Sequence, residues 1–336
     1  MSSPGATPWA AGTATGVGSL PGTDALAAAR AAVDLCPALP FLPELPERGV
    51  GADLVGRGTG LLAELPVDLQ PAGWRLVPRA GHDLRRTLDL LERDLDAVQE
   101  ALDGYRGPFK VQACGPWTLA ALVELPRGDK VLADPGAVRD LAAALGEGLA
   151  RQVADLRRRL PGLTDVLVQL DEPGLAAVAA GHVPTASGFD VLRTPKAVEL
   201  AAVLHAVSDA VRAAGGVPGA HCCAARPPVA TLVAGGAGFV GVDVTLLTPR
   251  DDDELGEALE AGTALLAGLV PTSVEPADVG VTMQPLQALW SRLGLPTDRL
   301  GAVAVTPTCG LAGASPDTAA QALRRSRETA EELVQQ

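Results

Sequence analysis

Short hydrophobic runs alternate with longer amphipathic segments along most of this chain. Between the short runs, hydrophobic residues recur with the spacing of a helix, as at residues 83–102, 137–160, 195–214, 252–261, 284–293 and 316–334. Such alternation is typical of βα units built around a parallel sheet. Eight short runs, rich in Val, Leu and Ala, are predicted strands, at residues 14–19, 39–43, 109–114, 165–170, 217–222, 239–244, 264–270 and 302–306.

Eight strands that alternate with helices favour a closed barrel over an open sheet. The sequence therefore predicts an α/β protein with the fold of a single (β/α)8 TIM barrel. Residues 49–81 are rich in Gly and Pro and fit neither period, so we interpret them as an insertion after the second strand. Residues 1–12 contain mainly small residues and proline, and we expect them to form a flexible tail before one barrel domain at residues 13–336.

Composition narrows the class of protein. A hydrophobic fraction of 47% with 20% charged residues is typical of a globular protein. The net charge of −13 argues against nucleic acid or an anionic membrane surface as a partner, because phosphate groups would be repelled. The chain has no signal-peptide pattern, and an uninterrupted apolar run of about 18 residues is absent, so we expect a cytoplasmic protein.

Four residues far apart in the sequence have the chemistry of a zinc site. His221 and Cys223 are two residues apart, so on an extended segment their side chains share one face while Cys222 points to the other. Cys223, Asp243 and Cys309 each lie at or just past the C-terminal end of a different predicted strand, and the ends of these strands meet at one mouth of a barrel. Zinc binds imidazole, thiolate and carboxylate groups. The predicted ligands are therefore His221, Cys223, Asp243 and Cys309.

Other predicted strands also end in polar residues. Ser19, Glu44 and Asp171 follow three of them, and residues 114–116 follow another. All of these ends would face the same mouth as the zinc site. We therefore expect one pocket that contains the metal ligands together with a hydroxyl group and two carboxylates.

Five short motifs occur in order along the chain. They are G-S-L-P at 18–21, C-G-P-W-T at 114–118, Q-L-D-E-P-G-L at 169–175, H-C-C at 221–223 and T-C-G-L at 308–311. With these motifs the chain resembles the cobalamin-independent methionine synthases, specifically their C-terminal catalytic barrel and its short single-barrel relatives. The resemblance runs nearly from end to end.

The resemblance implies a role for each matching residue. His221, Cys223 and Cys309 would bind zinc, and Asp243 would replace the glutamate ligand of the family. The amino-acid end of homocysteine would be held by Val17, Gly18, Ser19, Glu44 and Asp171. Asp171 would also be a catalytic residue. Two carboxylates suit the ammonium group of this substrate, and a hydroxyl group suits its carboxylate.

A zinc ion at this site would make a thiol reactive. A free thiol has a pKa of about 8.5 and is mostly protonated at neutral pH, whereas the thiolate is the nucleophile. Zinc favours the thiolate and orients its sulfur. Together with this chemistry, the resemblance implies a zinc-dependent methyltransferase that converts homocysteine to methionine.

The methyl donor is where the chain departs from the family. Leu122 and Ala177 stand where the family has a Trp and a Glu that bind methylfolate, and residues 222–309 contain no histidine to match the family's catalytic one. Methylfolate has a poor leaving group that must be protonated, whereas a methyl-cobalt corrinoid needs no proton. We therefore expect the donor to be a methylated corrinoid or a corrinoid protein.

Two other functions stay open from the sequence. The same barrel could carry a different zinc-dependent thiol alkyltransferase or lyase, for example one acting on a small sulfonate thiol, which would favour Arg or Lys near the pocket. The chain could also be a non-catalytic protein that binds zinc or a thiol. Asp171 and Asp243 have a further structural interpretation, because an aspartate after a strand commonly caps a helix.

Overall fold

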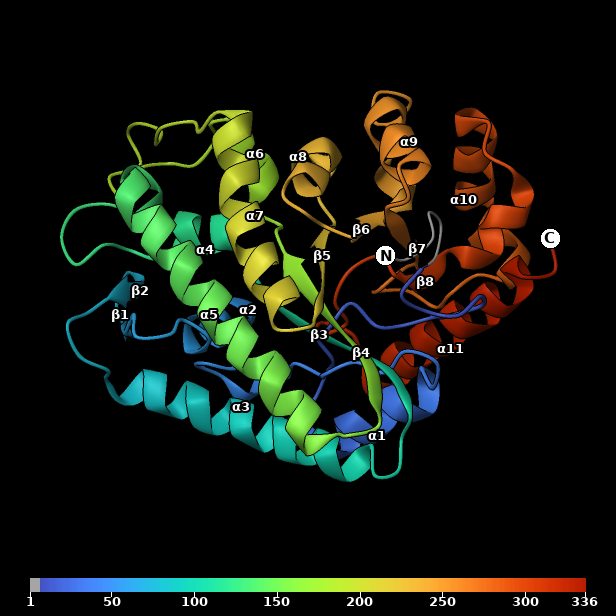
Figure 1. The fold of residues 1–336 in the computed structure, drawn as a ribbon, viewed down its shortest axis with the longest axis horizontal. Coiled ribbons are helices and arrows are strands. Elements are labelled where there is room, and N and C mark those ends of the chain that lie inside the picture. Colours follow the sequence, from blue (N-terminus) through green and yellow to red (C-terminus); the bar gives the residue numbers. More distant parts are fainter. Residues whose placement is uncertain (1–6) are drawn as a thin grey trace.

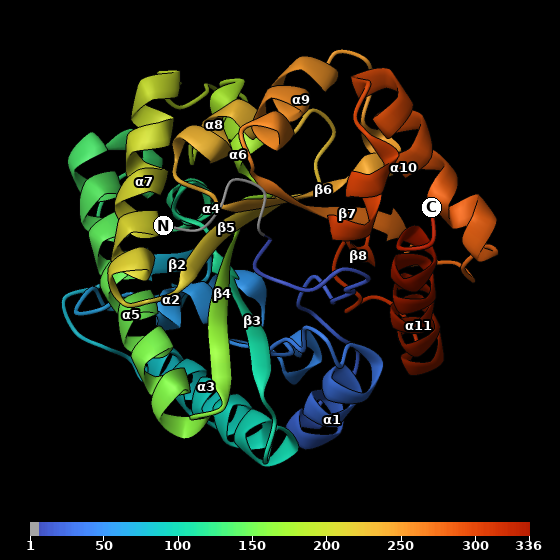
Figure 2. The ribbon, with the colours of Figure 1, turned by 45° about the vertical axis from the view of Figure 1, so that its right-hand side comes forward.

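The computed structural model describes residues 7–336, and its centre is a six-stranded parallel sheet that curls round on itself (Figures 1 and 2). The strands pair in chain order, each with the next. They are rich in Val, Leu and Ala and almost wholly buried, as expected for a parallel sheet covered on both faces. Their bounds are β3 Gly107–Cys114, β4 Leu163–Asp171, β5 Val217–Cys222, β6 Phe239–Asp243, β7 Ala264–Val270 and β8 Ala304–Pro307.

Helices surround the curled sheet, most plainly in Figure 2. All six helices expected from the hydrophobic spacing are confirmed, and five further α-helices, α1, α4, α6, α8 and the helix α2 (Leu54–Gly60) of the insertion, add to them in the described residues. The N-terminus of α1 is capped by Asp24, whose side chain accepts from two backbone N–H groups. The longer helices are α1 Ala25–Leu35, α3 His82–Ala101, α5 Pro135–Arg159, α7 Ala197–Ala213, α9 Asp252–Glu260, α10 Val279–Leu293 and α11 Pro316–Leu333. The short ones are α4 Pro116–Leu122, α6 Leu175–Ala179 and α8 Val229–Ala234. No helix in residues 7–336 has the length and apolar character needed to cross a membrane.

The first two segments expected as strands form isolated parallel bridges in place of regular strands. Ala14 pairs with β8, Ser19 pairs with Glu44, and Phe41 pairs with β3. Two prolines in the second segment have no N–H group to donate, and two glycines weaken the first, which explains why the pairing is interrupted. The structure thus shows a curled sheet of six strands, and a complete barrel of eight regular strands is not shown.

The expected insertion contains structure of its own. Residues 49–81 include helix α2 (Leu54–Gly60) and an antiparallel hairpin of β1 (Val67–Gln70) and β2 (Gly73–Leu76). Arg86 on α3 donates hydrogen bonds to the carbonyl groups of Arg48 and Val50, where the insertion begins. These contacts attach the segment to the outer helices.

The expected N-terminal tail is partly packed against the sheet. Residues 1–6 lie outside the described residues, but Trp9 is 5% exposed, and its indole N–H donates to the Ala302 carbonyl at 3.0 Å. The Trp9 ring meets Phe239 edge to face, with 5.8 Å between the ring centroids. Phe239 is the first residue of β6, so Trp9 fills the N-terminal end of the sheet. Its large apolar ring explains why residues 7–12 differ from the loose tail expected.

Replacing Trp9 with Ala should therefore lower the free energy of unfolding by about 3–5 kcal/mol, the usual cost of truncating a buried aromatic residue. Phe189 is 97% exposed, and Phe189→Ala serves as the matched control with an expected change within about 0.5 kcal/mol. Urea unfolding followed by circular dichroism measures both changes. Equal stability of the two variants would show that residues 7–12 do not pack as described.

Candidate functional site

One cavity of about 220 Å³ lies at the C-terminal ends of the strands. Parallel strands in a curled sheet direct these ends to one side, so residues distant in the sequence meet there. Of the residues predicted for the pocket, all line this cavity except Asp243 and residues 114–116. Those that line it are Val17, Gly18, Ser19, Glu44, Asp171, His221, Cys223 and Cys309.

Two cysteine thiols lie in contact at the cavity. Cys223 follows β5 and Cys309 follows β8, and their sulfur atoms are 3.1 Å apart. The hydrogen bond from Cys223 lowers the pKa of Cys309 to about 6, and the same contact raises the pKa of Cys223. The contact therefore favours the thiolate form of Cys309, and the thiolate is the form that binds metals and acts as a nucleophile.

His221 is oriented by a carboxylate. Its Nδ1 lies 3.1 Å from Asp171 Oδ1, and both side chains are buried. The same Asp171 oxygen accepts a hydrogen bond of 2.7 Å from the Gln169 side chain, which fixes the carboxylate in turn. A carboxylate on one ring nitrogen is the usual arrangement behind a histidine that binds a metal through the other nitrogen.

The loop of residues 17–19 forms one wall of the cavity and is held in place by side chains of β3 and β4. The Val17 carbonyl accepts hydrogen bonds from Lys110 Nζ at 2.8 Å and from Gln169 Nε2 at 3.0 Å. Lys110 is completely buried, and this burial lowers its pKa to about 8. A Cβ atom on Gly18 would lie 2.7 Å from the Gln112 side chain, so the loop approaches β3 as closely as it does because residue 18 is glycine.

Glu44 is a buried carboxylate whose Oε1 accepts no hydrogen bond from any described residue. It is 4% exposed and lines the cavity, and Oε1 has Arg57 Nε as an ion-pair partner at 3.4 Å. Burial raises the pKa of Glu44 to about 7. Buried polar atoms are nearly always hydrogen-bonded in native proteins. An exception at a cavity wall is a position where a bound molecule can donate.

Asp243 lies apart from this group. Its Oδ1 accepts hydrogen bonds from the N–H group of Thr245 at 2.9 Å and from the Thr245 hydroxyl at 2.6 Å. It thereby caps the short 3-10 helix Val244–Leu246. Its role as a metal ligand stays a prediction, because the carboxylate would have to leave Thr245 to reach the cavity.

Glu172 has a structural role that the sequence did not reveal. Its carboxylate accepts from the backbone N–H groups of Trp117 and Thr118 and from the Thr118 hydroxyl, at 2.6–2.9 Å. It is completely buried, and burial raises its pKa to about 7. These bonds join the end of β4 to the start of α4. Glu172 and Thr118 both belong to motifs quoted above, and these motifs were the sequence signal from which the contact could have been predicted.

The donor groups at the cavity suit zinc, although a closed ligand set is not formed. Among the described residues, no three His, Cys, Asp or Glu side chains are placed so that they could hold one metal ion. Tetrahedral zinc with Zn–S bonds of about 2.3 Å would separate two sulfurs by about 3.7 Å. The two thiols at 3.1 Å would therefore have to part slightly. Two thiols and an imidazole backed by a carboxylate are appropriate ligands by type.

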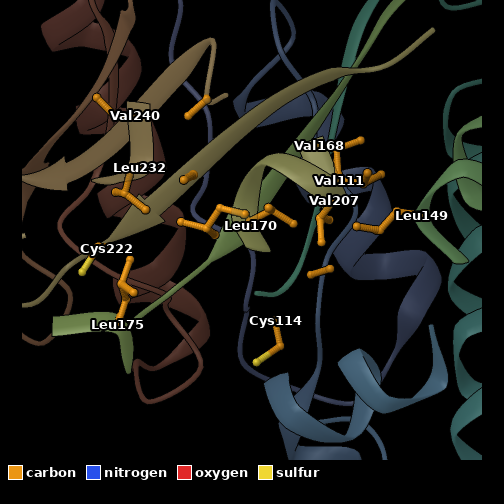
Figure 3. Packing of buried hydrophobic residues seen from close by; sticks show 14 of the residues in the cluster. Val111, Cys114, Leu149, Val168, Leu170, Leu175, Val207, Cys222, Leu232 and Val240 are labelled. Carbon is orange, nitrogen blue, oxygen red and sulfur yellow. The ribbon is translucent and has the colours of Figure 1, made fainter. Parts of the chain in front are cut away.

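Cys222 points away from the cavity, as predicted. It is fully buried, and Figure 3 shows it among the hydrophobic residues of the core together with Cys114. Burial raises the pKa of both thiols. The side chain of Cys222 thus lies in the core and that of Cys223 at the cavity, because successive side chains of an extended segment point to opposite faces.

Comparisons with known proteins give weak similarity. No family model and no curated protein matches this sequence. A B12-independent methionine synthase from Shewanella sp. W3-18-1 is 11% identical with a TM-score of 0.48, over 72% of this chain and 66% of that one, so the chain spans just under two thirds of its length. An endo-β-1,4-mannanase from Cellulomonas fimi is 12% identical with a TM-score of 0.39, over 76% and 60% of the two chains. An oxaloacetate acetylhydrolase is 14% identical with a TM-score of 0.36, over 87% and 75%. Values this low carry no argument about activity.

The five thiols should differ sharply in reactivity. Cys223 and Cys309 are half-buried, whereas Cys36, Cys114 and Cys222 are buried. In the folded, metal-free protein we expect Ellman's reagent to titrate the first two alone, and diamide to join them in a disulfide, as mapped by peptide mass spectrometry. In urea all five should react. A disulfide that involves Cys222, or labelling of the three buried thiols without denaturant, would contradict this arrangement.

Proposed function

We propose that this protein is a zinc-dependent methyltransferase that binds homocysteine in the cavity and methylates its sulfur to form methionine. One observation supports this function above all: the cavity brings together two thiols, an imidazole and two buried carboxylates. The thiols and the imidazole are suitable ligands for a metal that activates a thiol, and the two carboxylates can bind the ammonium group of an amino acid. The weak structural similarities play no part in this argument.

Each residue has a separate task in the proposed reaction. His221, Cys223 and Cys309 would hold zinc, and Asp171 orients the His221 ring through its Nδ1. Zinc, when bound, supplies positive charge that favours the thiolate form of the substrate and orients its sulfur. The thiol proton is released to solvent. The sulfur then forms a bond to the methyl carbon.

The charges around the cavity favour an amino acid over a sulfonate. Glu44 and Asp171 provide negative charge for an ammonium group, and the Ser19 hydroxyl is available to a carboxylate. None of the described residues that line the cavity is Arg or Lys, which a sulfonate would require. This lining favours homocysteine over the sulfonate thiol considered above.

We propose a methylated corrinoid as the methyl donor. The methyl carbon leaves cobalt as its bond to sulfur forms, and the electron pair stays on cobalt, so no acid has to protonate a leaving group. This agrees with the lack of histidine between residues 222 and 309. Steady formation of methionine from methylfolate by the pure protein would refute this choice of donor.

Cys309→Ser should remove both the metal and the activity. We expect one zinc per chain in the unmodified protein by plasma mass spectrometry, and zinc-dependent methyl transfer from methylcobalamin to homocysteine. In Cys309→Ser, turnover should fall more than about 100-fold, beyond the usual loss when only a hydrogen-bond partner of a metal ligand is removed. Cys222→Ser is the matched control, since this neighbouring thiol is in the core and should leave the zinc content unchanged. A protein that binds no zinc, or a Cys309→Ser variant that keeps it, would count against the proposal.

A further inference from the structure

Helix α2 of the insertion places a buried arginine behind Glu44, which lines the cavity. Arg57 is 3% exposed, and its guanidinium contacts two carboxylates. One terminal nitrogen donates to Asp94 on α3, and Nε lies 3.4 Å from Oε1 of Glu44. A charge this deeply buried needs ionic partners, and Arg57 joins an outer helix to the cavity through its two partners.

Asp94 fixes the position of this arginine. Arg48 donates to both oxygens of Asp94, at 2.7 and 2.8 Å, in the paired geometry that constrains a carboxylate most strongly. Asp94 is itself 3% exposed. The guanidinium of Arg57 is thus anchored from outside the cavity, and Glu44 lies between this fixed charge and the cavity.

The charges that face Glu44 come from three elements. Arg57 on α2 is the largest of those that lower its pKa, Lys110 on β3 lowers it less, and Asp171 on β4 raises it. Gln112 on β3 also lowers it through a hydrogen bond. The amine of Lys110 donates to other oxygens, one of them the Gln112 side chain. Arg57 is therefore the main counterion of Glu44.

We propose that Arg57 is a positioning residue that favours the ionised form of Glu44 at the cavity wall, and that the insertion thereby makes the cavity selective for ligands that carry an ammonium group. This inference rests on the proposed function, because it assigns a role within the same amino-acid site. It also gives residues 49–81 a purpose. Arg57 acts through Glu44 and does not touch the ligand.

Two ligands that lack a thiol test the inference apart from thiol and metal chemistry. L-methionine and 4-(methylsulfanyl)butanoate differ only in the ammonium group, and calorimetry with the zinc-loaded protein measures the affinity for each. The unmodified protein should prefer L-methionine by about tenfold or more, as expected for a hydrogen bond between charged groups. In Arg57→Gln this preference should fall below about twofold.

Arg48→Gln is the matched control. It removes the other arginine from Asp94, while the contact between Arg57 and Glu44 stays in place. The preference for L-methionine should persist in this variant. A preference that persists in Arg57→Gln, or that is lost equally in both variants, overturns the inference, because the arginine would then act only through the stability of the network.

The pH dependence provides a readout that a purely structural role would not change. Glu44 has a pKa of about 7, so the affinity of the unmodified protein for L-methionine should fall as the pH is lowered from 8 to 6. Without Arg57 the pKa of Glu44 rises, and the fall should begin at higher pH. The affinity for the butanoate should change less over this range. An unshifted profile in Arg57→Gln contradicts the inference.

Two further outcomes separate the inference from the function on which it rests. If the unmodified protein binds neither ligand, the proposed amino-acid site is wrong, and the inference fails with it. If Arg57→Gln does not fold, Glu44→Gln is compared with Glu44→Gln/Arg57→Gln, in which the Arg57–Glu44 ion pair is removed as a whole. The two should show the same small preference for L-methionine. A further loss in the double variant overturns the inference, because Arg57 would then act on something other than Glu44.

Discussion

The pairing of buried charges beneath the cavity is the constraint on which the rest of the site depends. Lys110, Arg57, Glu44 and Asp171 are all nearly inaccessible to water, and an isolated charge in such a place would be strongly unfavourable. Each is therefore tied to a partner on a different element. These ties fix the loop of residues 17–19, the His221 ring and the insertion relative to one another, so the polar groups meet at the cavity in a defined arrangement.

The sequence predicted the central fold because hydrophobic alternation reports local structure directly. The six strands from β3 to β8 and the six expected helices appear where their patterns indicated. The first two segments could not be judged in the same way. Their composition resembles that of strands, but regular pairing requires N–H groups in register, which prolines lack. Trp9 was also missed, because nothing in a short segment of small residues shows that one aromatic ring will be covered.

At the site, the sequence predicted that residues at strand ends would meet, and it did not indicate the residues that lie behind the cavity. His221, Cys223 and Cys309 lie at strand ends that converge and all three line the cavity, whereas their role in metal binding stays a prediction. Asp243 is the last residue of β6, yet its side chain bonds to Thr245. The direction in which this side chain points depends on local geometry that the sequence does not show. Arg57 and Asp94 carry no signal in the sequence, since their pairing joins an irregular segment to a distant helix.

The aromatic pair of Trp9 and Phe239 has a bearing on how the chain folds. The two rings pack with Leu39, Leu167 and Leu266 at the end of the curled sheet opposite to the cavity. Trp9 and Phe239 are far apart in the sequence, so their contact closes a long loop of chain, and such non-local contacts slow folding. Residues 7–12 therefore reach their place only once the strands that they cover have paired.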